Sequence, residues 1–573
     1  MNIEKNIRNA REISRPFFAP FESYHRNIGS LLEHWAAKRP NELYLAYYDD
    51  DVGLQRSFSY REFRDMVNRT AQVMTSRLGL KRGDKIATLS YNHYYTAIIY
   101  FAAWSLGICV VPINVEEDDP RIEFVLENSE SKVFFAMPDL LERATTVAGC
   151  VPCIREIVAI TGGTGTMLDL ATSLDTMPAT LPDSAADVAA EDSGLIVYTS
   201  GTTGMPKGVE LSQYNMLVDA YGMADWYKFK PGARMMCILP IHHVNGIIVT
   251  MVTPLYYGGS VVLNRRFRSH AFWRRLADER VECVSLVPTI LKFLSDANED
   301  ISNYDLRALK YILCGAGPLL IPVAEEFHRK FGRRINHGYG LSETTAYTCF
   351  LPIDLTDEKY RYWITNFGYP SIGCAIAPNE MAIFDSEGNR VEPGESGEIV
   401  IRGLNVMNGY FKRDDANKDA FRTGWFHSGD QGFYIVDSAG REFFFITARI
   451  KEVILRGGTY VYPLEIDPVI QAVPGVQIGL AVGFDNEYQG EEVGAYVVPQ
   501  PGARLTEDDV LRFCAERLPF PKRPKAVVFG NEVVMTATGK PKRLSLKHHF
   551  KDYFGVQFRK TKESGRSETG SDV

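Results

Sequence analysis

The fold of this chain is decided by the stretch Leu195-Ile-Val-Tyr-Thr-Ser-Gly-Thr-Thr-Gly-Met-Pro-Lys-Gly208. Its leading apolar residues predict a buried strand. The loop that follows combines glycines, hydroxyl side chains and one lysine: Thr199, Ser200, Gly201, Thr202, Thr203, Gly204 and Lys207. Glycines let backbone N–H groups approach an anion, the hydroxyls add donors and the lysine adds positive charge. The stretch is not a Walker A loop, because Pro206 precedes the lysine and Gly208 follows it. It predicts a phosphate-binding loop after a strand.

Outward from this loop, apolar strands and helical segments alternate over residues 60–400. Predicted strands cover residues 85–89, 133–136, 195–198, 234–239, 281–286 and 311–314, and predicted helices cover residues 60–78, 271–279 and 321–331. Such alternation is typical of largely parallel sheets covered by helices. From residue 376 onward, glycine turns separate short strands, which predicts a small antiparallel β unit.

A separate module begins after Thr447, where the pattern of short helices and strands starts again. We therefore expect an α/β fold. Residues 1–447 would form a large N-terminal domain of layered α/β sheets plus the small β unit. Residues 448–555 would form a small α+β C-terminal domain, a usual domain size. The polar residues 556–573 predict a disordered tail.

Composition excludes several classes of protein. The formal net charge of −8 argues against a general nucleic-acid binder, which needs a positive field.

Two uncharged stretches, residues 94–114 and 246–263, are long enough to span a membrane. Each divides into a helix, a glycine stop and a short β-branched strand, so we expect no transmembrane span. The absence of an apolar leader and the burial of most cysteines in apolar runs favour a cytoplasmic protein. The sequence leaves open whether the protein forms a homodimer.

Four further clusters carry chemistry. Gly315-Ala316-Gly317 follows a predicted strand and can present backbone atoms to a base or ribose. Gly338-Tyr-Gly-Leu-Ser-Glu343 offers an aromatic ring, a hydroxyl and a carboxylate, which suit stacking, phosphate contact and Mg²⁺. Asp430 follows a glycine in an aromatic turn and can hold a ribose diol. Lys540 lies on a Gly-Lys-Pro turn near the C-terminus. The simpler alternatives are a helix-capping loop, a β-turn and a solvated basic loop.

Taken together, these motifs resemble the adenylate-forming enzymes, which include acyl- and aryl-CoA synthetases, firefly-type luciferases and adenylation domains of peptide synthetases. The resemblance covers about residues 30–550, with the motifs in family order and spacing. It implies an ATP-dependent carboxylic acid–CoA ligase that forms an acyl adenylate, then an acyl-CoA thioester, and releases AMP and pyrophosphate. ATP, Mg²⁺ and coenzyme A would be required. The alternatives are a carrier-protein-directed adenylation enzyme and a non-catalytic nucleotide-binding regulator.

The resemblance also implies roles for individual residues. Residues 199–207 would hold the β- and γ-phosphates, and Gly315, Ala316, Gly317, Tyr339 and Gly340 would line the adenine site. Ser342, where relatives more often carry Thr, would contact the α-phosphate, and Glu343 would ligate Mg²⁺. Asp430 and Arg449 would hold the ribose hydroxyls. Lys540 would bridge the substrate carboxylate and the α-phosphate, and with Lys207, Ser342 and Glu343 it completes the implied catalytic set.

Relatives of this kind move their small domain between the two half-reactions. The implied pivot is Lys451, and Gly457 and Gly458 would help form the tunnel for the CoA thiol. His243 and Gly338 would lie beside the acid. For the neighbouring His242, a buried structural role is an equal alternative.

Overall fold

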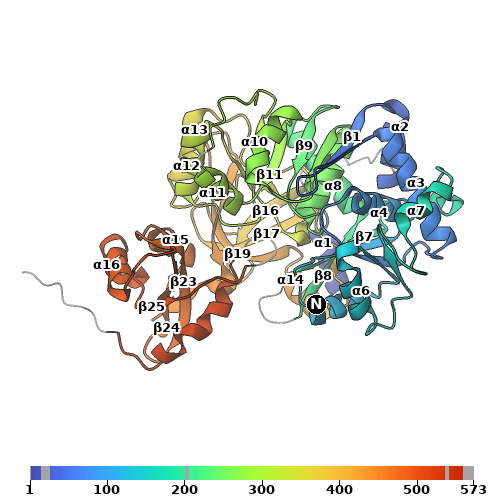
Figure 1. Cartoon of the computed structure of the whole chain (residues 1–573). Helices are drawn as coiled ribbons and strands as arrows, with labels where there is room; N and C mark the ends of the chain where they lie inside the picture. Colours follow the sequence, from blue (N-terminus) through green and yellow to red (C-terminus); the bar gives the residue numbers. More distant parts are fainter. Residues whose placement is uncertain (1, 15–25, 200–204, 298, 536–540, 559–573) are drawn as a thin grey trace, which may run out of the picture. The chain divides into compact units, whose positions relative to one another are not determined.

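The computed structural model describes residues 2–14, 26–199, 205–297, 299–535 and 541–558 (Figure 1). Within these residues the chain divides into two compact units, one ending at Thr447 and the other beginning at Ala448. Each unit has its own sheets and its own apolar core.

The first unit contains a nine-stranded sheet. Its strands are β1 (Leu43–Asp49), β2 (Leu54–Ser59), β9 (Arg234–Cys237), β10 (Ser260–Asn264), β11 (Cys283–Leu286), β12 (Tyr311–Cys314), β13 (Asn336–Tyr339), β14 (Cys349–Phe350) and β15 (Cys374–Ala375). They lie in the order β15-β14-β13-β12-β11-β9-β10-β1-β2. Strands β1, β10, β9, β11, β12 and β13 run parallel, so their carboxyl ends lie at one edge.

A seven-stranded sheet forms the second layer of strands. It contains β3 (Lys85–Leu89), β4 (Cys109–Ile113), β5 (Val133–Ala136), β6 (Glu156–Ala159), β7 (Ser193–Thr199), β8 (Lys207–Ser212) and β18 (Gly409–Tyr410). The order is β18-β8-β7-β4-β3-β5-β6. Strands β3, β4, β5, β6 and β7 run parallel to one another. Strand β8 runs antiparallel to its two neighbours, β7 and β18. The predicted phosphate loop thus connects two adjacent antiparallel strands.

Helices form the other layers of the first unit. The α-helices are α1 (Ile3–Ala10), α2 (Ile28–Lys38), α3 (Tyr60–Ser76), α4 (Tyr94–Ser105), α5 (Asp119–Ser129), α6 (Leu141–Ala148), α7 (Leu170–Ser173), α8 (Gln213–Tyr227), α9 (Thr253–Tyr257), α10 (Ser269–Asp278), α11 (Pro288–Ala297), α12 (Ile321–Phe331), α13 (Asp357–Thr365) and α14 (Asp414–Ala420). Short 3₁₀ turns are η1 (Pro138–Leu140), η2 (Leu174–Thr176), η3 (Asp183–Asp187) and η5 (Ser342–Thr344), and η4 (Asn245–Val252) is a π-helix.

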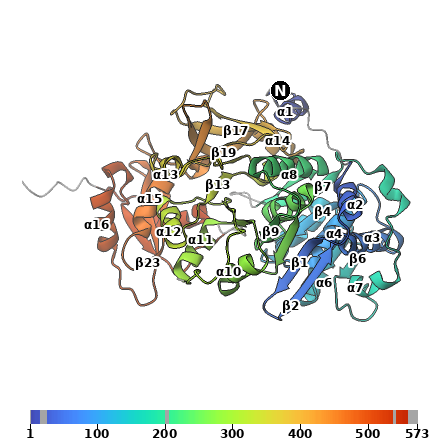
Figure 2. The same cartoon turned by 90° about the horizontal axis from the view of Figure 1, so that it is seen from above.

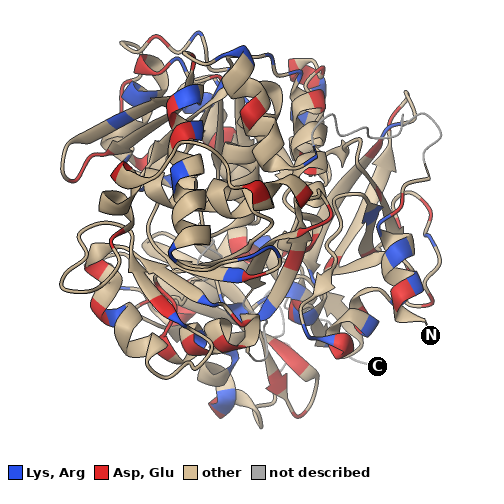
Figure 3. Cartoon of the chain, turned by 90° about the vertical axis from the view of Figure 1, so that its right-hand side faces the viewer, with Lys and Arg blue, Asp and Glu red and all other residues tan. Residues whose placement is uncertain are grey.

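Helix α8 lies between β9 of one sheet and β7 of the other (Figures 1 and 2), and residues of α4 belong to the same apolar core. Both are buried on nearly all sides, and they share one apolar core with residues of both sheets. This explains why their sequences lack an amphipathic pattern, since a helix covered on every side is apolar all round. No helix among the described residues has the length and apolarity needed to cross a membrane. In Figure 3 basic and acidic positions are interspersed along the ribbon.

A small antiparallel sheet completes the first unit. Its strands are β16 (Asn379–Phe384), β17 (Gly397–Gly403), β19 (Phe426–Val436) and β20 (Glu442–Arg449), in that order across the sheet. The pairing of β17 with β19 is interrupted, because Glu398 pairs with Gln431 whereas Val400 pairs with His427. Residues 428–430 therefore bulge opposite Ile399. The predicted β unit is confirmed, and the bulge was not predicted.

The second unit is a five-stranded sheet with two main helices. It comprises η6 (Ile450–Glu452), β21 (Ile454–Arg456), β22 (Thr459–Val461), α15 (Pro463–Gln471), β23 (Val476–Asn486), β24 (Gly490–Pro499), α16 (Glu507–Arg517), η7 (Phe520–Lys522), β25 (Ala526–Phe529) and η8 (Arg543–Tyr553). The strand order is β22-β21-β24-β23, and β25 pairs with β24. The predicted fold class is thereby confirmed.

A buried arginine ties several elements of this second unit together. Arg543, at the start of η8, is 4% exposed and binds both carboxylate oxygens of Asp467 on α15, at 3.0 and 2.6 Å. Its guanidinium also donates to Glu452 of η6 at 3.2 Å and to the carbonyl of Ala481 on β23. These carboxylates raise the pKa of Arg543, although burial opposes the charge. One side chain thus joins η6, α15, β23 and η8.

Several boundaries differ from the sequence prediction, among them the following three. Strand β11 begins at Cys283 instead of residue 281, because the N–H of Val281 closes the end of α10 by donating to Leu276. The apolar run predicted as one helix over residues 247–257 is a π-helix followed by α9. The ring of Phe558 packs near Phe484, so residues 556–558, predicted as tail, belong to the second unit.

Candidate active site

The predicted phosphate loop joins the ends of β7 and β8. Thr199, the last residue of β7, pairs with Lys207, the first residue of β8. The hydroxyl of Thr199 lies 3.4 Å from the carbonyl oxygen of Lys207. Ser200, Gly201, Thr202, Thr203 and Gly204 lie outside the described residues. The two ends of the loop are therefore fixed by a strand pair.

Lys207 and Glu343 are brought together by Tyr410. The ammonium group of Lys207 lies 4.2 Å from the centroid of the Tyr410 ring, a cation–π contact. The hydroxyl of Tyr410 donates to Oε1 of Glu343 at 2.8 Å. In addition, the N–H of Met407 donates to the carbonyl of Glu343 at 2.9 Å. A cation and a carboxylate from distant motifs thus share one aromatic neighbour.

Tyr339 and Asp430 form a second pair. The Tyr339 hydroxyl donates to Oδ2 of Asp430 at 2.6 Å, although the residues are 91 positions apart. Tyr339 ends β13 and is 7% exposed, and Asp430 lies in the bulge of β19 and is 3% exposed. The aromatic ring predicted to contact adenine therefore lies directly beside the carboxylate predicted to contact ribose.

Tight backbone packing explains two of the predicted glycines. A Cβ at Gly315 would lie 2.7 Å from the Tyr347 hydroxyl and 2.9 Å from the carbonyl oxygen of Gly338. A Cβ at Gly340 would lie 1.7 Å from the carbonyl oxygen of Ala346. Ala316 has a positive φ of 62°, which is uncommon for a residue with a side chain. The loops after β12 and β13 are consequently held against each other. The adenine roles of Gly315, Ala316 and Gly317 stay predictions.

The residues predicted beside the acid lie at the start of η4. The rings of His242 and His243 are 4.5 Å apart between centroids. Burial holds the pKa of His242 well below its usual range, so this imidazole is neutral near pH 7. Asn245, the first residue of η4, donates through Nδ2 to the Tyr347 hydroxyl at 3.4 Å. The π-helix has the wider hydrogen-bonding turn that is frequent at functional sites.

Gly338 has a reason of its own to be glycine. A Cβ there would lie 2.4 Å from the Phe350 ring, on the neighbouring strand β14. This requirement comes from packing within the sheet, and the predicted contact of Gly338 with the acid stays a prediction.

Four of the remaining predicted residues, Arg449, Lys451, Gly457 and Gly458, lie in or next to the second unit. Arg449 ends β20, and Lys451 is an exposed residue of η6. Gly457 and Gly458 form the turn between β21 and β22, with φ values of 53° and 83°. Two successive positive φ angles in a two-residue loop are those of a type I′ hairpin turn, for which glycine is suited. Lys540 lies outside the described residues.

Two residues of the site were missed from the sequence. Tyr410 lies in Asn408-Gly-Tyr410, where a glycine and an aromatic residue follow β17 and could have drawn notice. Tyr347 follows the Glu343 motif by a few residues and is buried between Gly315 and Asn245. Neither belongs to a pattern whose spacing alone indicates a ligand.

A buried carboxyl group lies behind this region. Asp219 on α8 is fully buried, and Nδ2 of Asn405 donates to its Oδ1 at 3.0 Å. Among the described residues, Oδ2 of Asp219 and Oδ1 of Asn405 have no hydrogen-bond partner. Burial raises the pKa of Asp219 to about 8, against the opposing effect of Asn405. A proton on Oδ2 removes the buried charge. It also turns this oxygen into a donor, the kind of partner that Oδ1 of Asn405 lacks.

We expect Asp219→Asn to change how stability depends on pH. The pKa of Asp219 is about 8 in the folded chain and about 4 in an unfolded one. The stabilising contribution of the neutral carboxyl is thus fully present below pH 4 and is lost as the pH rises toward 8. The variant, always neutral, should gain stability relative to wild type by about 1 kcal/mol per pH unit in this window. Thermal unfolding at pH 5, 6, 7 and 8 measures the difference.

The matched control for this prediction is Asp225→Asn, an exposed carboxylate on the same helix that pairs with Lys228. It should leave the pH dependence close to that of wild type. Parallel curves for Asp219→Asn and wild type would show that Asp219 is ionised in the folded chain.

Comparison with known proteins agrees with this geometry. The AMP-binding enzyme family model matches residues 32–411, and the AMP-binding enzyme C-terminal domain matches residues 465–540. An oxalate–CoA ligase of Arabidopsis thaliana is 30% identical over 533 residues, covering 91% of this chain and 98% of the relative. A sulfoacetate–CoA ligase of Cupriavidus necator is 32% identical over 486 residues, covering 82% and 88%. The crystal structure of ATP-bound MatB from Rhodopseudomonas palustris aligns with a TM-score of 0.79 at 26% identity, covering 92% and 99%.

The family match and the layered sheets make this chain an α/β enzyme of the AMP-binding class. The chain belongs to the AMP-binding enzyme family, the adenylate-forming enzymes that the sequence motifs resemble.

Proposed function

We propose how individual residues of this chain perform its reaction, the ATP-dependent joining of a carboxylic acid to CoA. In the first step the acid's carboxylate oxygen attacks the α-phosphate of ATP. A new P–O bond forms, the bond to the β-phosphate breaks, and pyrophosphate leaves. In the second step the CoA thiol, losing its proton, attacks the acyl carbon and AMP leaves. The first step brings one anion onto another, so the site must supply cations and oriented dipoles.

The observation that carries the assignment is the hydrogen bond between Tyr339 and Asp430. It aligns an aromatic ring, suited to adenine, with a buried carboxylate that can accept from both ribose hydroxyls. Residues 315–317 would complete the adenine site, and Arg449 would add a donor for the ribose. Ser342, the first residue of η5, would contact the α-phosphate.

The opposite end of the nucleotide would lie against the β7–β8 loop. Residues 199–207 would hold the β- and γ-phosphates, with the charge of Lys207 directed there by the Tyr410 ring. Glu343 would be the protein ligand of Mg²⁺. No group of three His, Cys, Asp or Glu side chains suited to a metal occurs in the described part of the chain. One carboxylate fits Mg²⁺, which proteins bind through one or two carboxylates together with substrate phosphates. When bound, Mg²⁺ neutralises charge on the phosphates.

The second unit would serve both steps. Lys540 would place its charge between the carboxylate and the α-phosphate during adenylation. Rotation about Lys451 would then present the face that contains Gly457 and Gly458 to the CoA thiol. A hinge of one or two residues is the usual device for such a movement. Lys451 is exposed and lies in the short turn η6, which suits a pivot.

We expect Glu343→Gln to raise the Mg²⁺ requirement. Glutamine keeps an oxygen that can accept from Tyr410 but loses the negative charge. The Mg²⁺ concentration for half-maximal pyrophosphate release should rise roughly tenfold or more. Glu325→Gln, an exposed change on α12, is the matched control. An unchanged Mg²⁺ titration would remove Glu343 from the metal site.

The reaction itself is tested by pyrophosphate release from ATP with a panel of acids. The panel should contain short dicarboxylates, a sulfonated acid, hydroxycinnamates and fatty acids, each with and without CoA. Production of acyl-CoA, AMP and pyrophosphate with one acid would identify the substrate. Release of pyrophosphate without any thioester to CoA would favour a carrier protein as acceptor. Absence of release with every acid would contradict the assignment.

A further inference from the structure

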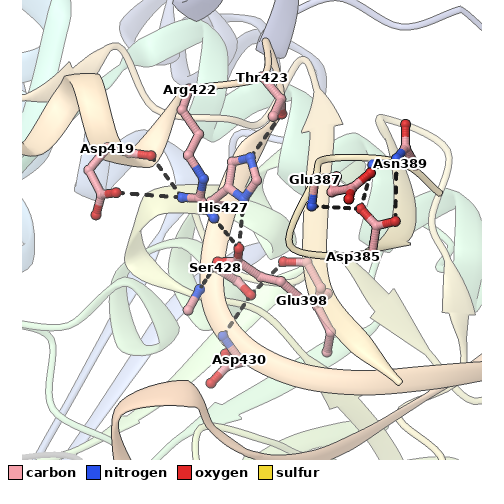
Figure 4. A network of polar contacts seen from close by, with 12 residues as sticks. Asp385, Glu387, Asn389, Glu398, Asp419, Arg422, Thr423, His427, Ser428 and Asp430 are labelled. Atoms are coloured by element: carbon pink, nitrogen blue, oxygen red, sulfur yellow. Dashed lines mark hydrogen bonds and ion pairs between the residues drawn. The ribbon is translucent and has the colours of Figure 1, made fainter. Parts of the chain in front are cut away.

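A polar network lies behind Asp430, centred on Glu398 of β17 (Figure 4). Oε1 of Glu398 accepts from the N–H of Gly429 at 3.0 Å. Oε2 accepts from Nδ1 of His427 at 2.7 Å and from the guanidinium of Arg422. Both carboxylate oxygens are therefore engaged. These donors hold the pKa of Glu398 below its usual range, although burial opposes its ionisation.

The network fixes the β-bulge at residues 428–430 from both sides. The Ser428 hydroxyl donates to the carbonyl of Ile399 at 2.6 Å and accepts from the N–H of Asp430 at 3.0 Å. Between them, Gly429 has a φ of 72° and points its N–H at Glu398. Glu398 and Ser428 together bind the backbone on either side of the Gly429 Cα, directly before Asp430. The direction of the Asp430 carboxylate, toward Tyr339, thus depends on this bulge.

The donors to Glu398 are themselves held in place. Nε2 of His427 lies 2.8 Å from the Thr423 hydroxyl, and Nη1 of Arg422 donates to the carbonyl of Asp419 at 3.0 Å. The helix α1 reaches the same segment, since Nδ2 of Asn6 donates to the carbonyls of Phe421 and Arg422 at 2.8 and 3.1 Å. The carboxylate of Glu398 therefore lies in a fixed frame of donors, as a group that orients another requires.

We propose that Glu398 is a positioning residue for nucleotide selection: by holding the N–H of Gly429, it orients the Asp430 carboxylate toward the ribose hydroxyls. The proposal rests on the ribose role given to Asp430 under the proposed function. Glu398 touches no substrate. Glu398 therefore affects how strongly the site prefers a nucleotide with both ribose hydroxyls over a nucleotide that lacks one of them.

Glu398→Gln is the sharpest variant, because it keeps the size of the side chain. The remaining oxygen can still accept from the N–H of Gly429. The new NH₂ group is itself a donor, so it cannot accept from His427 and Arg422 as the carboxylate oxygen did. The measured quantity is kcat/KM for ATP relative to 2′-deoxy-ATP and 3′-deoxy-ATP, with KM and kcat resolved. We expect KM for ATP to rise roughly tenfold with a smaller change in kcat, and the preference for ATP to fall toward that of Asp430→Asn. Adding Glu398→Gln to Asp430→Asn should then have little further effect.

Glu442→Gln on β20 is the matched control, since it also loses an ion pair with an arginine, Arg390. It should keep the wild-type preference. If Glu398→Gln fails to fold, Arg422→Met removes one donor from a side chain that is 40% exposed and should lower the preference in part. An equal loss with all three nucleotides would overturn the proposal and give Glu398 a structural role only. If Asp430→Asn keeps the wild-type preference, the ribose role of Asp430 fails first, and the proposal with it.

Discussion

Replacement of Lys540 by Ala is expected to abolish acyl-adenylate formation while largely sparing thioester formation from a supplied acyl adenylate. In the first step an acid anion approaches a polyanion, and the lysine would neutralise the charge that gathers between them. Removing a group that stabilises developing charge costs roughly 10²–10³ in rate. In the second step the thiol meets a neutral acyl carbon, so this charge is not required. Pyrophosphate release with acid and ATP measures the first step, and acyl-CoA formation from purified acyl adenylate measures the second.

Lys542→Ala provides the matched control for this experiment, because it removes the same charge two positions away. The N–H of Lys542 pairs with the carbonyl of Val534 at 2.8 Å, a backbone contact that the substitution keeps. Both steps should stay near wild type in this variant. If Lys540→Ala slowed both steps equally, the lysine would serve the fold or the CoA step, and near-normal adenylation would remove it from the reaction.

Replacement of Arg543 by Met is expected to destabilise the second unit by about 3–5 kcal/mol, as the loss of one partner of a buried ion pair does. Methionine fills much of the space but leaves Asp467 and Glu452 without their shared cation. The side chains of Asp467 and Glu452 are 8% and 21% exposed, so water replaces the guanidinium poorly. Joint replacement with Asp467→Leu should recover part of the loss, because an apolar pair leaves fewer charges buried.

The measurement must follow the second unit alone. All six tryptophans, at positions 35, 104, 226, 273, 363 and 425, precede residue 447, so their fluorescence reports on the first unit. Hydrogen exchange of peptides from α15 and β23 reports on the second and should quicken strongly in the variant. Arg512→Met removes an exposed ion pair with Asp509 in α16 and should change exchange little. Similar exchange in Arg543→Met and wild type would contradict the structural role of Arg543.

Parts of the fold were predictable because local signals agree with the tertiary structure. The bounds of β12 and α12 match the prediction from sequence, since glycine or proline marks their ends. The π-helix was not predictable, because residues 245–252 are mostly apolar and show no period. Its widened turn depends on packing against α8 and against strands β9, β10 and β11, which local sequence does not encode.

The site was predictable in its motifs but not in its connections. The positions of Tyr339 and Asp430 follow from short patterns, yet their hydrogen bond requires β13 and β19 to meet. Tyr410 and Glu398 had no such pattern, since their roles depend on strand pairing with β8 and on the interrupted register with β19. Residues that position other residues are therefore harder to identify from sequence motifs than residues that contact a ligand.

The π-helix η4 has a consequence for how this protein could change over evolution. Each wide turn contains one residue more than an α-helical turn, so loss of a single residue there would let regular hydrogen bonding close. The residues that precede the deletion would then rotate by about 100° about the helix axis relative to those that follow it. His243 and Asn245 would be swung to a different side, and Asn245 would leave the hydroxyl of Tyr347. A one-codon deletion could therefore remodel the wall that we propose to face the acid while leaving the strands of both sheets where they are.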